Sequence, residues 1–243
     1  MAEQLAPMPT DWRRALAVAA HPDDLEYGAA AAVAVWSDEG RECAYLLATF
    51  GEAGIDSLPP QEAAELREAE QRASAVVVGA TAVEFLGHTD GVLEYGMALR
   101  REVAAAVRRH RPELVLTLNH HDTWPGGSWN TPDHRAVGRA VLDAVGDAGN
   151  RWIFPDLAED GLAPWNGVRY VAVAGSPAPT HAMDAGAGLE RAVQSLLCHR
   201  TYIEALTDEP PEQYCRRFLE GGMAAVAERF GGRPGVAFEL FTR

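Results

Sequence analysis

Two continuous apolar runs near the start of the chain limit the folds that it can adopt. Residues 14–20 (RALAVAA) and 42–49 (ECAYLLAT) are apolar along almost their whole length, without the alternation that marks a strand with one wet face. A helical stretch at residues 27–40 lies between them, which is the pattern of a strand–helix–strand unit. Because strands that are apolar on both faces need cover on both sides, we expect a mostly parallel sheet with helices on both faces.

The same alternation of short strands and longer helices continues to the C-terminus. It predicts further strands at residues 83–87, 113–118, 168–174 and 236–241, and further helices at residues 61–79, 99–112, 132–146, 189–200 and 212–230. No internal repeat or low-complexity linker interrupts the pattern. We therefore expect a single-domain, Rossmann-like α/β fold that covers residues 1–243.

Charge and cysteine content narrow the function. The chain carries 35 acidic and 21 basic residues, a formal net charge of −14, and such a surface repels phosphate backbones and anionic lipids. We therefore expect no nucleic-acid partner and no membrane partner. Three separated cysteines without a CxxC pattern indicate reduced thiols. The first residues lack the basic and apolar regions of a signal peptide, so we expect a cytoplasmic protein.

Polar residues gather where the predicted strands end. The run HPDD at residues 21–24 follows the first strand, Glu52 follows the second, His88 and Asp90 follow the third, and the polar loop 119–134 follows the strand at 113–118. In open parallel sheets, ligands bind beyond the carboxyl ends of the strands. A surface turn explains one such cluster, but four successive clusters favour a functional site.

The residue types at these ends indicate a metal site. The chain lacks the GxGxxG, GxxxxGK[ST] and GxSxG motifs of dinucleotide-binding, phosphate-binding and serine-hydrolase sites. His21, Asp24 and His134 form a set of two imidazoles and one carboxylate, which leaves a position open for water or substrate on a catalytic metal. Asp23, between two of these ligands, is a candidate base for the metal-bound water. The alternative is a turn that caps a helix, with His134 in the first turn of another helix.

Two motifs carry a family resemblance. The segments AAHPDDLEYG and TPDHRAVGRA resemble the PIG-L/LmbE-type N-acetylglucosaminide deacetylase family, whose marks are an AHPDD motif and a later H-x-D-H motif. Four further segments are similar to the family's second-strand loop, its R-x-x-E helix, its FLG-x-x-DG stretch and its C-terminal helix: ATFGEAG, LREAEQRASAVVVGA, VEFLGHTDGVLE and THAMDAGAGLERAVQSLLCHRTYI. The resemblance implies Zn²⁺-dependent hydrolysis of an N-acyl amide, usually an acetyl group on an amino sugar.

The resemblance also implies roles for single residues. It assigns the metal to His21, Asp24 and His134 and makes Asp23 the general base. Three more residues fall where the family's substrate-contacting loops lie: Glu52, Arg67 and Asp90. For Arg67, an ion pair with Glu70 on the surface of a helix is the alternative.

One departure from the family concerns the oxyanion. The first histidine of H-x-D-H, which the family uses to stabilise the oxyanion, is replaced by Thr131. A hydroxyl donates a hydrogen bond but carries no positive charge, and the loss of one oxyanion donor typically costs a factor of about 10²–10³ in rate. We expect His121, rather than His120, to supply the missing donor from the loop 119–130. Trp129 and Thr131, in or next to the same loop, are further candidate substrate contacts.

The sequence therefore predicts a metal-dependent enzyme that removes an acyl group, most simply acetyl, from a small N-acetylated amino sugar or glycoside. The metal is Zn²⁺ or, alternatively, Fe²⁺. Two alternatives stay open: an amidase that acts on a thiol or glycoside conjugate, and a binding module that keeps the metal but has lost turnover, which Thr131 favours. A homo-oligomer is compatible with the sequence.

Overall fold

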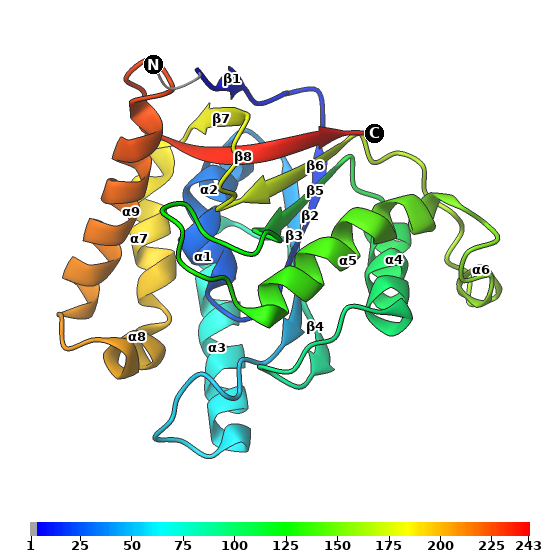
Figure 1. Cartoon of the computed structure of the whole chain (residues 1–243), viewed down its shortest axis with the longest axis horizontal. Helices are drawn as coiled ribbons and strands as arrows, with labels where there is room; N and C mark the ends of the chain where they lie inside the picture. The colour runs from blue at the N-terminus through cyan, green and yellow to red at the C-terminus, as the bar shows by residue number, and fades with distance from the viewer. Residues whose placement is uncertain (1–3) are drawn as a thin grey trace.

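The computed structural model describes residues 4–243. Its strands are β1 (Ala6–Pro7), β2 (Arg14–Ala19), β3 (Glu42–Thr49), β4 (Ala82–His88), β5 (Leu114–Leu118), β6 (Tyr170–Ala174), β7 (His181–Asp184) and β8 (Gly235–Thr242). They form one eight-stranded sheet in the order β1-β7-β8-β6-β5-β2-β3-β4 (Figure 1). The β6–β8 and β7–β8 pairs are antiparallel and the other neighbouring pairs are parallel. The prediction of a mostly parallel sheet is confirmed.

Helices cover both faces of this sheet, as the sequence predicts (Figure 1). They are α1 (Asp24–Gly28), α2 (Ala30–Asp38), α3 (Pro60–Val78), α4 (Met97–His110), α5 (Pro132–Gly149), α6 (Asp156–Glu159), α7 (Leu189–Leu197), α8 (Arg200–Leu206) and α9 (Pro211–Ala227), with a short 3₁₀ turn at Gly186–Gly188. One hydrophobic core joins the sheet to α2, α3, α7 and α9. The other core joins the opposite face to α4 and α5.

The central position of β2 explains why apolar and polar residues do not alternate in its sequence. Ala15, Ala17 and Ala19 lie in the core beneath α2 and α7, and Leu16 and Val18 lie in the core beneath α4 and α5. All five side chains are buried. Both faces of the strand exclude water, so apolar residues are favourable at every position.

The helix predicted at residues 27–40 is divided in two. The chain breaks at Ala29, whose φ of −150° is not helical, so that α1 ends before α2 begins. Gly28 at this break lies against the end of β5, and a Cβ atom there would stand 2.6 Å from the Leu118 side chain. The short α1 therefore keeps the HPDD turn next to the carboxyl end of β5.

The short elements that lie outside the predicted pattern include β1, β7 and α6. Each has two to four residues, which is too short for a period of 2 or 3.6 residues to be visible. The helix predicted at residues 189–200 ends at Leu197, and α8 begins after His199. Within residues 4–243, no helix is both long enough and apolar enough to cross a membrane.

The chain order reverses at the centre of the sheet. From β2 the chain moves to β3 and β4 on one side, and then returns to β5 on the other side of β2. Loops that leave β2 and β5 therefore diverge, and the crevice between them is where open α/β sheets bind ligands. The HPDD turn follows β2, and the loop before α5 follows β5.

Candidate active site

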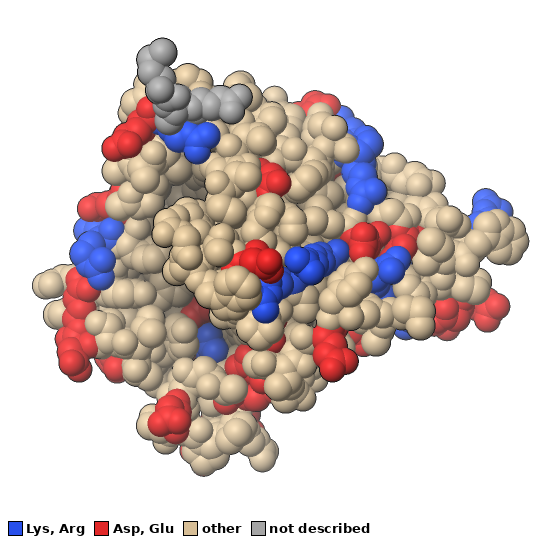
Figure 2. Space-filling view, viewed as in Figure 1, with Lys and Arg blue, Asp and Glu red and all other residues tan. Residues whose placement is uncertain are grey.

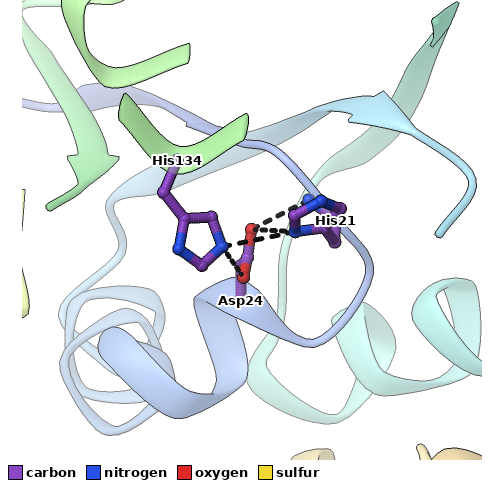
Figure 3. Close-up of side chains that lie close together, drawn as sticks. All are labelled: His21, Asp24 and His134. Carbon is purple, nitrogen blue, oxygen red and sulfur yellow. Dashed lines mark hydrogen bonds and ion pairs between the residues drawn. The ribbon is translucent and has the colours of Figure 1, made fainter. Parts of the chain in front are cut away.

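His21, Asp24 and His134 point toward one another at this crevice (Figure 3). His21 Nδ1 lies 3.3 Å from His134 Nε2, which lies 2.9 Å from Asp24 Oδ1. His21 Nδ1 is 3.5 Å from Asp24 Oδ2. Tetrahedral Zn²⁺ with bonds of about 2.0–2.1 Å separates neighbouring ligand atoms by about 3.3 Å. The three side chains thus fit the requirements of a divalent metal.

The remaining ring nitrogens of both histidines meet oxygen atoms. His21 Nε2 is 3.1 Å from Asp133 Oδ2 and 3.0 Å from Asp90 Oδ1. His134 Nδ1 is 3.1 Å from Asn130 Oδ1. Histidines that bind a metal usually donate their second N–H in this way, which fixes the tautomer and the ring orientation. His21 Nδ1 and His134 Nε2 are then the nitrogens that keep a free lone pair.

Asp24 is built into the strand-to-helix turn. Its Oδ2 accepts the backbone N–H groups of Ala20 at 3.0 Å and His21 at 2.8 Å. Burial alone would raise the pKa of Asp24, but His134 and His21, when their imidazoles are protonated, hold this pKa well below its usual range by their charges and hydrogen bonds. The carboxylate is therefore ionised, as a metal ligand must be.

Asp133 is a site residue that our sequence reasoning missed. It is buried, and besides His21 it accepts the backbone N–H groups of Gly91 at 2.7 Å and Leu93 at 3.0 Å. Burial raises the pKa of Asp133, but these hydrogen bonds outweigh burial and lower it overall. Its place next to His134, inside the second motif, was the signal that could have identified it.

Asp23 occupies an unusual environment beside the three ligands. It is 4% exposed and its backbone is left-handed, with φ of 83°. Burial raises the pKa of Asp23 to about 6, although Arg67 and His199 act against this rise. Arg67 Nη2 is 3.2 Å from Asp23 Oδ2, yet among the described residues no donor makes a hydrogen bond to this oxygen. A carboxylate that titrates near neutrality suits a general base.

The predicted substrate contacts Glu52, Arg67 and Asp90 support the loops of the site. Arg67 is 2% exposed and donates to the carbonyl groups of Pro22 at 2.7 Å and Gly51 at 2.8 Å. Glu52 Oε1 accepts the backbone N–H of Asp90 at 2.9 Å. Asp90 Oδ2 accepts the backbone N–H of Ala53 at 2.9 Å, and Asp90 Oδ1 lies 3.0 Å from His21 Nε2. A direct contact of these residues with a substrate stays a prediction.

Thr131 and Trp129 lie just before α5. Thr131 is the N-cap of this helix, and its Oγ1 accepts the backbone N–H of His134 at 3.3 Å. Trp129 is 69% exposed, and the guanidinium of Arg135 lies 4.9 Å from its ring centroid. Figure 2 shows the surface hollowed between this loop and the side of the molecule formed by α7 and α9. A contact of Thr131 or Trp129 with a substrate also stays a prediction.

His121 faces β8. Its Nε2 is 2.7 Å from Glu239 Oε2, which also accepts the Ser176 hydroxyl at 2.6 Å. The His121 backbone carbonyl accepts a hydrogen bond of 3.0 Å from Asn130, the residue that orients His134. The structure thus links His121 to the candidate metal ligands through its backbone, and its role as oxyanion donor stays a prediction.

Asn130 is a second residue that our sequence reasoning missed. Its Nδ2 donates to the carbonyl groups of Asn119 at 2.8 Å and His121 at 3.0 Å, and its Oδ1 accepts from Thr131 N at 2.8 Å and from His134. The two carbonyl groups fix the orientation of the amide, so that its oxygen must face His134. An asparagine in a polar loop carries no sequence signal for such a role.

Comparison with known proteins identifies the family of the chain. The family model described as "PIG-L: GlcNAc-PI de-N-acetylase" matches residues 16–145. A diacetylchitobiose deacetylase of Thermococcus kodakarensis is 30% identical over 141 residues, which cover 57% of this chain and 51% of the relative. A 1D-myo-inositol 2-acetamido-2-deoxy-alpha-D-glucopyranoside deacetylase of Kineococcus radiotolerans is 32% identical over 190 residues, which cover 63% of this chain and 49% of the relative.

A solved structure shares the fold. The N,N'-diacetylchitobiose deacetylase from Pyrococcus horikoshii, in complex with its inhibitor MPG, superposes with a TM-score of 0.85 at 24% sequence identity, covering 96% of this chain and 85% of that one. The chain spans about half the length of the curated relatives it matches. The family model nevertheless covers more than half of the chain, including both motifs and all three candidate ligands. The chain therefore belongs to the PIG-L family.

Proposed function

We propose that the protein is a metal-dependent hydrolase that removes the acetyl group from the N-acetyl amine of an amino sugar or glycoside. The observation that carries this proposal is the convergence of His21, Asp24 and His134 on one point, with the buried carboxylate of Asp23 beside them. The names of the relatives, which are deacetylases of N-acetylglucosamine compounds, support the same reaction. We propose that residues 1–243 act as one such domain, in the cytoplasm.

The donor set supports Zn²⁺, with Fe²⁺ as the alternative, because two imidazoles and a carboxylate suit both ions. When bound, such a metal polarises an amide carbonyl and lowers the pKa of a water molecule. The hydrogen bonds that the second N–H groups of the imidazoles donate to Asp133, Asp90 and Asn130 would hold both rings in the orientation that metal binding needs.

In this proposal Asp23 performs the proton transfers. Its carboxylate accepts a proton from the attacking water and returns this proton to the leaving amine. Arg67, at 3.2 Å, balances the charge of Asp23 without a hydrogen bond to the same oxygen. A base of this kind contributes a factor of about 10²–10⁴ to the rate.

The substrate is proposed to be a small N-acetylated compound held between the HPDD turn and the loop before α5. Exposed Trp129 offers an aromatic face for a sugar ring, and the hydroxyl of Thr131 or the imidazole of His121 offers a donor to the oxyanion. Glu52, Arg67 and Asp90 are proposed to shape the same site. We propose no nucleic-acid partner, because the formal net charge of −14 repels phosphate backbones.

The test is acetate release by the purified, metal-loaded protein from N,N'-diacetylchitobiose, an N-acetylglucosaminyl inositol and an N-acylated thiol conjugate. We expect release from at least one of the sugars, and a fall in its rate by about 10²–10⁴-fold in Asp23→Asn at unchanged metal content. Release from the thiol conjugate alone would establish the amidase alternative. Binding of a sugar without release would favour the binding module that Thr131 suggests, and full activity of Asp23→Asn would contradict the mechanism.

A further inference from the structure

The backbone of Asp23 needs support from its surroundings. Its φ of 83° and ψ of −24° lie in the left-handed region, which side-chain-bearing residues adopt at an energetic cost. Such a conformation persists only where neighbouring groups hold it. The conformation also determines where the Asp23 carboxylate points, because it sets the direction of the Cα–Cβ bond.

Gln71 on α3 binds the backbone of Asp23. Its Oε1 accepts the Asp23 N–H at 2.9 Å, and both residues are buried. Because water does not reach this N–H, Gln71 supplies the hydrogen bond that the group would otherwise lack. One turn earlier on the same helix face, Arg67 donates to the carbonyl of Pro22. Helix α3 thus binds both the carbonyl and the N–H of the peptide group that joins Pro22 to Asp23.

Glu26 fixes the orientation of the Gln71 amide. Gln71 Nε2 donates to Glu26 Oε1 at 2.9 Å, and the Ser74 hydroxyl donates to the same oxygen at 2.6 Å. Glu26 is 0% exposed, and His199 Nε2 stands 3.6 Å from its second oxygen. A carboxylate accepts hydrogen bonds, so the NH₂ group of Gln71 must face Glu26 and its oxygen must face Asp23.

We propose that Gln71 is a positioning residue that holds Asp23 in its left-handed conformation and so aims the carboxylate for proton transfer. Glu26 acts one step further away, since it selects the orientation of the Gln71 amide. This inference rests on the proposed function for its catalytic part. Its structural part, the hydrogen bond from Asp23 to Gln71, is independent of the reaction.

The first experiment compares kcat and KM of Gln71→Met with those of the wild-type protein. Methionine has a similar length but offers no oxygen to Asp23, and a small displacement of a catalytic group can cost a factor of about 10² in rate. We expect kcat to fall by about 10- to 100-fold, with KM and metal content unchanged. Val78→Ala is the matched control, because Val78 is equally buried on α3 but is not among the contacts of the HPDD turn. It should lower the melting temperature and leave kcat unchanged.

The second experiment places Gln71→Met in the Asp23→Asn background. If Gln71 acts through Asp23, it should cause no further loss of kcat there. An additional loss of the same size would overturn the proposal, because Gln71 would then act independently of Asp23. If Gln71→Met does not fold, Gln71→Asn serves instead, since its shorter side chain cannot reach Glu26 and Asp23 together.

A third experiment uses NMR to measure hydrogen exchange of the Asp23 backbone N–H, and its result does not depend on enzymatic activity. The wild-type protein and Val78→Ala should protect this N–H from exchange, and Gln71→Met should lose the protection. Equal protection in all three proteins would overturn the inference. If the wild-type protein releases no acetate from any substrate, the proposed function fails, while this measurement still decides whether Gln71 holds the turn.

Discussion

Replacement of Asp133 by asparagine should weaken metal binding, because the aspartate accepts more hydrogen bonds than an amide can. Its Oδ2 meets His21 Nε2 and Gly91 N, and its Oδ1 meets Leu93 N. Asparagine has one oxygen, so in either orientation its NH₂ group faces a backbone N–H or the N–H of His21. At least one hydrogen bond is lost and one repulsive contact is created.

The size of the effect follows from the position of Asp133. Loss of an outer hydrogen bond to a metal-binding histidine typically costs about 10- to 100-fold in metal affinity, which corresponds to about 1.4–2.8 kcal/mol. Because Asp133 holds both His21 and the backbone at Gly91 and Leu93, we expect the upper end of this range. The substitution also removes a buried negative charge next to His21.

The assay is a competition for Zn²⁺ between the protein and a chromogenic chelator at constant pH. Asp143→Asn is the control, since Asp143 lies on the same helix but is exposed and accepts a hydrogen bond from Tyr95. Asp143→Asn should bind the metal as the wild-type protein does. An unchanged affinity in Asp133→Asn would refute the reasoning, because His21 would then need no carboxylate partner to bind the metal.

Three further predictions address other parts of the molecule. His121→Ala should lower kcat/KM by about 10²-fold at unchanged metal content if the His121 imidazole donates to the oxyanion. A kcat/KM equal to that of the wild-type protein would show that another group is the oxyanion donor. Burial lowers the pKa of His199, but the Glu26 carboxylate, 3.6 Å away, and the nearby Asp23 and Glu70 raise it overall above its usual 6.5. The stabilising charge of His199 is therefore present below pH 6.5 and is lost as the pH rises through the raised value. The pKa of His21 is also raised, so denaturant unfolding across this range should show a smaller decline in His199→Gln than in the wild-type protein. Arg108→Met should reduce the free energy of unfolding by about 3 kcal/mol or more. The reason is that Arg108 is buried and donates hydrogen bonds to several backbone carbonyls around residues 147–162. A reduction below about 1 kcal/mol would show that water takes over the hydrogen bonds of the guanidinium.

The sheet and the meeting of the candidate ligands could be predicted for one physical reason. His21 and His134 are 113 residues apart, yet each follows a buried apolar strand. Parallel strands end at the same edge of a sheet, so residues that follow neighbouring strands come together whatever their separation in sequence. The pattern of apolar residues was therefore sufficient to locate the site, although it did not give the break at Ala29.

The polar support beneath the site could not be predicted from the same pattern. Helix α3 contains the run EAAELREAEQR, which is typical of a solvent-exposed helix. Its buried face nevertheless includes Arg67, Gln71 and Ser74, spaced four and three residues apart. Hydrophobic periodicity detects only apolar stripes, so a buried polar stripe is hidden from it. The partners that make this stripe tolerable lie in the HPDD turn, at Gly51 after β3, on α1 and on α7. Only the folded chain brings them together.

Asp23 and Asp24 show how far environment separates two identical side chains. Asp24 faces two imidazoles and two backbone N–H groups, which together stabilise its charge and lower its pKa. Asp23 is also buried, and the charges of Arg67 and His199 do not outweigh this burial, so its pKa is raised. Pairs of carboxyl groups whose environments move their pKa values apart are suited to different chemical tasks. The left-handed backbone of Asp23 sets the direction of its side chain. The hydrogen bond that its N–H donates to Gln71 helps to hold this conformation and so to keep a candidate ligand and a candidate base distinct.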